Sequence, residues 1–433
     1  MKSKFSVLSL LLLTLVLVRT SFATELVAKA VSENVSESAA AIEELRNLGP
    51  AGLNELRTRY AAEIKKHIDD PLLKADPEWL RITKALDTVS GQKNSYLSGL
   101  YWYTDLESAQ RVAAASGKPI LSLRLLGKLT DDLSCANSRF FRTVLYSNAE
   151  IATVLRDRFV LHWQSVRPAP IITIDFGDGR KLERTITGNS IHYVLDSSGQ
   201  LLEALPGLYG PQAFLRGLAD AEGLFKSVNG PLNRKPNQER SQLLWQYYSA
   251  KLDKINVAWY EDITKIGGKA PKGFVVTPGR DGKLEAITVA PLAITKAYSE
   301  ANVLRAMTGT PEALGTITDE AAWQKIAALH ASDAVLDSGS IALIRRQNPA
   351  LSESEFSAML KKFQELIALD TVRNEYLLHT KLYPWLLRDP RRTDLQKFNE
   401  KVYAELFLTP GSDPWLGLLT KDAYLAIDNG GVN

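Results

Sequence analysis

The sequence predicts an α/β protein in which a central domain, a mixed β-sheet with helices on both faces, lies between two helical regions. Two observations support this class. Between residues 97 and 228, apolar runs of strand length alternate with helix-like repeats, an order typical of a mixed sheet covered by helices. On either side, apolar residues recur every three to four positions. We therefore expect a short helical region over 24–96, the α/β domain over 97–228 and a mainly helical domain over 229–433.

The first 23 residues are typical of an export signal. Lys2 and Lys4 precede an apolar stretch from Phe5 to Val18, and Ser21-Phe22-Ala23 fits a small-x-small cleavage site. The stretch is shorter than the roughly 20 apolar residues that cross a bilayer. We therefore expect cleavage after Ala23, no membrane span in the mature chain, and an extracytoplasmic location, either periplasmic or secreted.

The predicted signal also carries the excess positive charge of the chain. The full sequence has 52 Lys and Arg against 49 Asp and Glu, and the signal contains three basic residues, Lys2, Lys4 and Arg19, with no acidic one. The mature chain is formally neutral, so composition does not support a nucleic-acid or anionic-membrane surface. Its length and the 45% apolar content of the full chain suffice for two or three domains with apolar cores.

Local signals define the individual elements. From Glu33 to Asp87 the pattern is helical, and Gly49-Pro50 ends one helix and begins the next. Gly117-Lys118-Pro119 ends the first helix of the central domain, and Gly177-Asp178-Gly179 is a hairpin turn. The expected central elements are a helix over Glu107 to Ala115, a strand over Ile120 to Leu126, helices over Arg139 to Leu145 and Ala149 to Arg156, a strand over Phe159 to Val166, a hairpin of Ile171 to Phe176 with Lys181 to Thr187, a hairpin of Ile191 to Leu195 with Gln200 to Leu205, and a helix over Pro211 to Glu222.

The C-terminal domain is expected to be mainly helical and contains no catalytic motif. Ser352 and Glu355 fit a capping box, and the helix that follows has an apolar face from Phe356 to Ile367, which predicts a buried helix. Arg234 to Arg240 is the expected linker, and Gly273 to Pro291 an expected hairpin.

Cys135 is the only cysteine, so the chain has no internal disulfide. It lies in Cys135-Ala136-Asn137-Ser138, between a strand-like and a helix-like run. Backbone N–H groups and the helix dipole at such a position stabilise a thiolate, and Arg139 and Arg142 would add positive charge. The alternative is a small buried apolar residue, a common role of free cysteine. The Ser138 hydroxyl would either donate to the thiolate or help to cap the helix.

Other catalytic and metal chemistries have little support. His162 and His192, on neighbouring predicted strands, would lie nearest to Cys135, but we expect them in the core or at its rim. His379, on a predicted helix with acidic neighbours, is expected on a solvated face. No metal site is expected, because soft-metal sites need clustered Cys and His. A serine hydrolase is not indicated, because the chain lacks a G-x-S-x-G motif.

Several short segments together resemble those of a known protein family. They are Trp102 to Asp105 before an alanine-rich helix, Gly117 to Leu121, the cysteine that opens the next helix, Arg158 to Val160, and Tyr193 to Asp196 before a turn. In this order and spacing, about residues 97–228 resemble the exported thioredoxin-like proteins. The resemblance implies a thioredoxin fold with Cys135 at the first position of the family's C-x-x-C site and Ser138 at the second, a C-x-x-S variant.

The chain departs from the family pattern at three places. The loop from Pro119 to Cys135 is a few residues longer, and the segment from Pro168 to Gly188 is an insertion. Ser190 stands at the position of the family's cis-proline, which shapes the wall where a substrate chain docks.

The resemblance implies a monothiol protein that acts in thiol-disulfide exchange or thiol redox. Cys135 and Ser138 would form its site, with Arg139, Arg142 and Ser190 in support, and its partner would be a protein client or a small thiol. No cofactor is expected. The alternative is a redox-silent scaffold or protein-interaction module. The single thiol and Ser190 favour the scaffold, whereas the position of Cys135 at a helix start favours redox chemistry.

Overall fold

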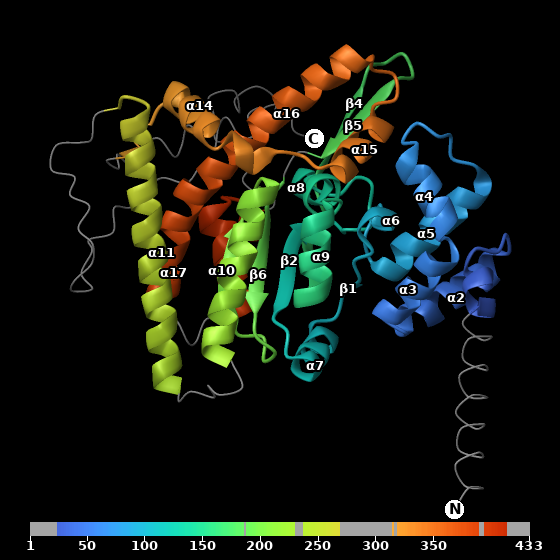
Figure 1. Cartoon of the computed structure of the whole chain (residues 1–433), viewed down its shortest axis with the longest axis horizontal. Helices are drawn as coiled ribbons and strands as arrows, with labels where there is room; N and C mark the ends of the chain where they lie inside the picture. Colours follow the sequence, from blue (N-terminus) through green and yellow to red (C-terminus); the bar gives the residue numbers. More distant parts are fainter. Residues whose placement is uncertain are drawn as a thin grey trace, which may run out of the picture.

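The structure is a computed structural model that describes residues 24–185, 188–229, 237–268, 314–315, 318–388 and 394–413. The predicted signal sequence (1–23) and the hairpin expected at 273–291 lie outside the described residues. The described chain is a mixed α/β structure with helical regions on both sides of its central sheet (Figure 1).

The central sheet has five strands in the order β1-β3-β2-β6-β7. The first three strands are parallel, and β6 and β7 run antiparallel to their neighbours. In the register of the central strand, Leu121 pairs with Leu161 on one side and with Val194 on the other. The strands are β1 (Trp102–Tyr103), β2 (Ile120–Leu126), β3 (Val160–Arg167), β6 (Ser190–Leu195) and β7 (Leu201–Pro206).

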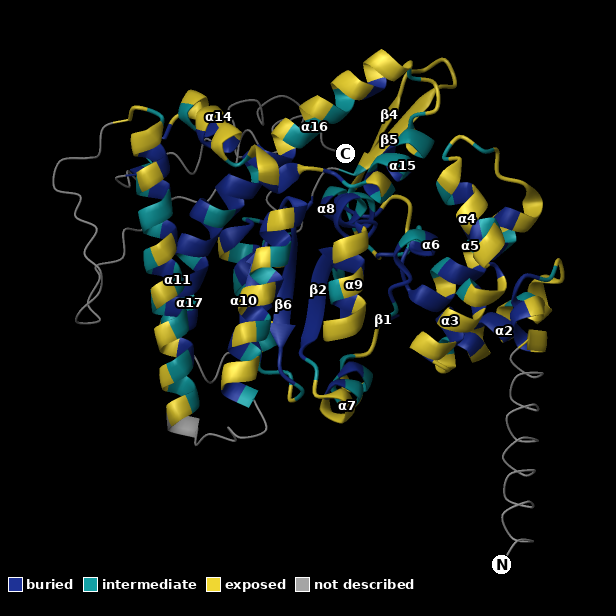
Figure 2. Ribbon diagram, viewed as in Figure 1, coloured by how far each residue is buried: buried dark blue, intermediate teal, exposed yellow. Residues whose placement is uncertain are grey.

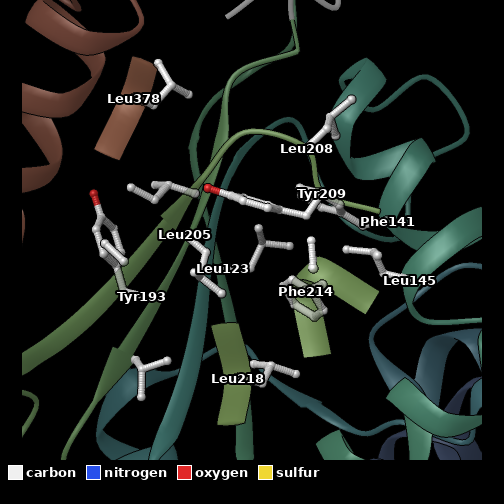
Figure 3. Close-up of a cluster of buried hydrophobic side chains, with 14 of the residues drawn as sticks. Leu123, Phe141, Leu145, Tyr193, Leu205, Leu208, Tyr209, Phe214, Leu218 and Leu378 are labelled. Atoms are coloured by element: carbon white, nitrogen blue, oxygen red, sulfur yellow. The ribbon is translucent and has the colours of Figure 1, made fainter. Parts of the chain in front are cut away.

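Helices cover both faces of this sheet, as expected. On one face, the His192 ring lies 4.6 Å from Phe141 and 5.1 Å from Phe214, so the helix after β2 and the last helix of the domain pack there. Leu123 lies in the same apolar cluster (Figure 3). The helices of the domain are α7 (Leu106–Ser116), α8 (Ala136–Phe140) with the π-helical turn η1 (Phe141–Leu145), α9 (Ala149–Arg158) and α10 (Pro211–Asn229).

The opposite face is covered from the C-terminal region. Tyr193, next to His192 in β6, points to this face, and its hydroxyl donates to Asn399 Oδ1 at 3.1 Å. The apolar core of the sheet therefore continues into the C-terminal helices. These are α11 (Asn237–Lys265), α14 (Glu320–Leu329), α15 (Ser338–Gln347), α16 (Glu353–Arg373), α17 (His379–Arg388) and α18 (Leu395–Lys401), with the short turns η2 (Ala331–Ala334), η3 (Asn374–Leu378) and η4 (Val402–Leu406).

Three expectations in this region need correction. The expected linker, Arg234 to Arg240, is helical from Asn237 onward, because α11 begins there. The predicted capping box at Ser352 is present, but the apolar face of α16 is not fully buried, since Leu366 remains 45% exposed. His379 is buried rather than solvated, and its Nε2 lies 3.1 Å from the Ala204 carbonyl oxygen of β7.

The N-terminal helices form a second apolar core of their own. The predicted break is confirmed, because Gly49 has a φ of 67° and Pro50 begins the next helix. Arg46 connects this region to the sheet, donating to the Trp102 carbonyl oxygen at 2.9 Å. The helices are α2 (Val35–Asn47), α3 (Pro50–Arg59), α4 (Ala61–Asp69), α5 (Pro77–Ser90) and α6 (Ser95–Ser98).

The predicted hairpin within the inserted segment forms a sheet of its own, β4 (Ile171–Asp175) with β5 (Lys181–Thr185). Its strands are exposed almost throughout, whereas β2 and β6 of the central sheet are buried at every position (Figure 2). Ile171, Ile174 and Phe176 are about half exposed, at 50%, 47% and 54%.

Candidate functional site

Cys135 lies directly before the first residue of α8, as the sequence predicts. Its backbone N–H donates to the Leu126 carbonyl oxygen at the end of β2, at 3.3 Å, which fixes the start of the helix against the central strand. Its thiol is completely buried, with 0% of the side chain exposed. Sγ lies 3.4 Å from the Ser190 hydroxyl, so the fold brings together two candidate residues that are 55 positions apart in the chain.

The C-terminal region closes the Ser190 side of this site. The Tyr403 hydroxyl of η4 donates to the Asn189 carbonyl oxygen at 3.1 Å. The Asn189 amide donates to the Thr409 hydroxyl at 2.8 Å. The start of β6, which faces Cys135, is therefore covered by residues that lie more than 200 positions later in the chain.

Ser138 is close in sequence to the thiol, but its hydroxyl contacts other groups. Its Oγ lies 2.5 Å from Ser134 Oγ and 3.0 Å from the Cys135 carbonyl oxygen. Both contacts lie within the loop before α8 and its first turn. They hold the backbone around the helix start, while α8 has no side-chain hydrogen bond at its N-cap.

Arg139 and Arg142, the two arginines of this segment, donate hydrogen bonds to different groups. Arg142 is buried and donates to the carbonyl oxygens of Leu129 at 3.1 Å and Asp131 at 2.8 Å, and to Ser134 Oγ at 3.1 Å. Burial lowers the pKa of Arg142 to about 10. Arg139 donates to the Thr185 hydroxyl at 2.9 Å and so joins α8 to the base of the exposed hairpin.

The neighbouring histidines are neutral core residues. His192 Nε2 lies 2.7 Å from the Tyr146 hydroxyl, and His162 Nδ1 lies 2.8 Å from the Ser122 hydroxyl. Burial lowers the pKa of each to about 3. Neither imidazole therefore carries a positive charge at neutral pH that would stabilise a thiolate.

A large groove opens on the outer side of the same helix start. We call it the α8–α16 groove; its volume is about 1010 Å³. Its apolar walls come from both helices, and the rings of Phe140 and Phe363 meet edge to face at 6.2 Å. In Figure 1, α16 crosses above α8 at this place. The residues that line the groove include Arg139, Phe140, Arg142, Thr143, Phe363 and Leu366.

Two arginines at the groove have unused donors. Among the described residues, the Nε atoms of Arg139 and Arg142 are buried without a hydrogen-bond partner, and the acceptors of both guanidinium groups are neutral. Because neither guanidinium is hydrogen-bonded to a carboxylate, a ligand carboxylate in the groove would be stabilised by their positive charge. Sequence reasoning missed this groove. The available signal was the apolar face of α16, which we had assigned entirely to the core.

In the part of the chain that the structure describes, no group of three or more His, Cys, Asp or Glu side chains could hold a metal ion. No helix of that part has the length and apolar content to cross a membrane. Comparison of the chain with protein-family models, with curated proteins and with solved structures finds no match.

Proposed function

We propose that this protein is an exported, thioredoxin-like binding protein that holds an apolar, acidic segment of a partner protein in the α8–α16 groove. The five-stranded mixed sheet with helices on both faces is the kind of sheet that the sequence resemblance implies. The 3.4 Å approach of Cys135 to Ser190 supports their alignment with the first-cysteine and cis-proline positions of that family. The signal-like N-terminus supports an extracytoplasmic location.

The single observation that carries this proposal is the contrast in access at the start of α8. A nucleophilic thiolate must reach a disulfide sulfur, and reactive cysteines are accordingly at least partly exposed. Cys135 is 0% exposed, and residues 403 and 409 cover the strand beside it. The groove next to it is open. Binding without thiol chemistry is therefore the function that this geometry favours.

The chemistry of the groove specifies the occupant. Phe140, Phe363 and Leu366 would contact apolar side chains, and the guanidinium groups of Arg139 and Arg142 would attract a carboxylate. A peptide also presents backbone N–H and C=O groups that need partners. The Gln347 amide, which lines the same groove, would provide them, whereas a fatty acid would not use it. These features favour a peptide segment with an acidic side chain.

The second candidate is monothiol exchange through Cys135. It is favoured by the position of the thiol at a helix start opposite Ser190. This function requires the segment around Tyr403 to move away first. Partner binding in the groove would then precede the chemistry, so the two candidates differ in whether the thiol is needed after binding.

The proposal is tested with fluorescein-labelled nine-residue peptides rich in Leu and Phe that carry a central Glu, compared with the same peptides carrying Lys. Fluorescence anisotropy should show binding of the Glu peptides only. Leu366→Asp should weaken that binding at least tenfold, because it places a carboxylate among the apolar side chains and near the arginines that would attract the peptide's own carboxylate. Leu329→Asp is the matched control, since Leu329 is 47% exposed on α14 outside the groove.

Cys135→Ala separates the two candidates. Unchanged peptide affinity in this variant, with no mixed disulfide formed between the wild type and a cysteine-containing peptide, supports binding alone. A mixed disulfide that forms on peptide binding supports monothiol exchange. Equal binding of the Glu and Lys peptides, or displacement of a fluorescent fatty acid without any peptide binding, would contradict the proposal.

A further inference from the structure

A second cavity lies at the junction between the N-terminal helices and the sheet domain. Its volume is about 240 Å³, and it opens between α3, α7, α9 and the β1 and β3 strands. Three of its lining residues are basic: Arg57 on α3, Lys118 before β2 and Arg156 on α9. None of its lining residues is acidic. Three converging cations repel one another unless an anion lies between them.

Arg57 is held in the cavity without a partner. Among the described residues its Nε is buried and has no hydrogen-bond acceptor. Burial, and then the charge of Arg156, lower its pKa. The guanidinium lies directly on the backbone of Gly99, where a Cβ atom would be only 1.4 Å from Nη1. Gly99 has a φ of +61°, a conformation that glycine adopts freely. The backbone therefore leaves space for this arginine.

The other two cations are only weakly compensated. Arg156 donates to the Ser98 carbonyl oxygen and to the Thr153 hydroxyl, both at 3.3 Å. Its Nε lies 3.6 Å from Asp157, whose side chain is 60% exposed. Lys118 donates to the Arg156 carbonyl oxygen at 3.4 Å, near the limit for such a bond. Most of the positive charge at the cavity is therefore not neutralised within the protein.

We propose that this cavity binds a small oxyanion of phosphate chemistry, with Arg57, Arg156 and Lys118 as its ligands. The planar guanidinium fork matches phosphate oxygens, and the lysine adds a point charge. A water occupies about 30 Å³ of liquid, so the cavity has room for a phosphate with a short organic group as well as for free phosphate. Tyr101 and Tyr103 line the cavity and would contact such a group.

Bound phosphate would connect two separately packed parts of the molecule. Arg57 belongs to the helices that form the N-terminal apolar core, whereas Lys118 and Arg156 belong to the sheet domain. An anion that contacts all three would hold the N-terminal helices against the sheet. Because it binds only where the two parts meet, it should stabilise the folded chain increasingly as its concentration rises above its dissociation constant.

The test is the melting temperature of the wild-type chain in sodium phosphate, sodium sulfate, sodium acetate or sodium chloride at equal ionic strength, with isothermal titration calorimetry of phosphate. We expect saturable binding in the calorimeter and a melting temperature that rises with anion concentration, most strongly in phosphate. Arg57→Gln should weaken phosphate binding at least tenfold and remove most of the rise. In chloride its melting temperature should be unchanged or higher, because a repulsion with Arg156 is removed. Arg111→Gln, a charge-matched change at an exposed site outside the cavity, should retain the full response.

Glycerol phosphate distinguishes the two sources of the anion. Tighter binding than that of inorganic phosphate indicates a phosphate ester, and equal binding indicates free phosphate. Three outcomes would overturn the proposal: no saturable phosphate binding by the wild type in the calorimeter, equal responses in acetate and phosphate, or equal phosphate binding by Arg57→Gln and Arg111→Gln.

Discussion

The two sides of the α8 helix start have opposite properties. On the inner side, the Cys135 thiol is completely buried against Ser190, and the C-terminal region covers the adjoining strand. On the outer side, Arg139 and Phe140 line a groove of about 1010 Å³. The same helix start therefore has an inaccessible thiol on one side and an open groove on the other. Access, rather than position in the fold, decides which side can act.

Substitutions at two adjacent residues of the turn η1, which follows α8, should differ most in their effect on the free energy of unfolding. Val144 is completely buried, whereas Thr143 lines the groove. Val144→Asp should lower the free energy of unfolding by about 3 to 5 kcal/mol, the cost of an unpaired buried charge. Thr143→Asp should cost less than about 1 kcal/mol, because its carboxylate remains near water and near Arg139. Urea unfolding measures both changes, and equal losses would mean that the two sides do not differ in burial.

The buried side should also be sensitive to acid through His192. Because burial lowers its folded pKa to about 3, the unfolded chain takes up a proton near pH 6.5 and the folded chain does not. Stability is therefore complete above pH 6.5 and is lost as pH falls toward 3. Between pH 7 and pH 5 this residue alone should lower the free energy of unfolding by about 2 kcal/mol. His192→Gln removes this loss while leaving a partner for the Tyr146 hydroxyl.

The measurement is the difference in stability between the wild type and His192→Gln at pH 7 and at pH 5. It should shift by about 2 kcal/mol in favour of the variant at the lower pH. A difference that stays constant would show that His192 titrates normally and that solvent reaches this side of α8. His67→Gln is a second reference: partial burial lowers its pKa, but it lies in the N-terminal helices, away from α8.

Local sequence signals were sufficient for most of the elements. The β2 strand follows from its Leu- and Ile-rich run, the β4–β5 hairpin from Gly177-Asp178-Gly179, and the α16 start from the Ser352 capping box. Each of these is determined within a few residues of the chain. The position of Cys135 before a helix was predicted for the same reason.

The features that local signals missed depend on contacts between distant segments. Cys135 is buried beside the strand that Tyr403 and Thr409 cover. No sequence pattern near position 135 predicts these distant contacts. His379 is polar on its own helix but lies against Ala204 of β7. Leu366 belongs to an apolar helix face, yet it remains 45% exposed, because it lines the groove between α8 and α16.

The alkylation rate of Cys135 tests the central claim most directly. If the thiol is a structural residue sealed beside Ser190, iodoacetamide at neutral pH should label the native wild type only at the rate at which the protein opens. Labelling should then accelerate in Val144→Asp by the factor by which the lost stability raises the population of opened protein, and should become fast in urea. Fast labelling of the native protein at neutral pH, at the same rate in the wild type and in Val144→Asp, would contradict the account and assign Cys135 to thiol chemistry.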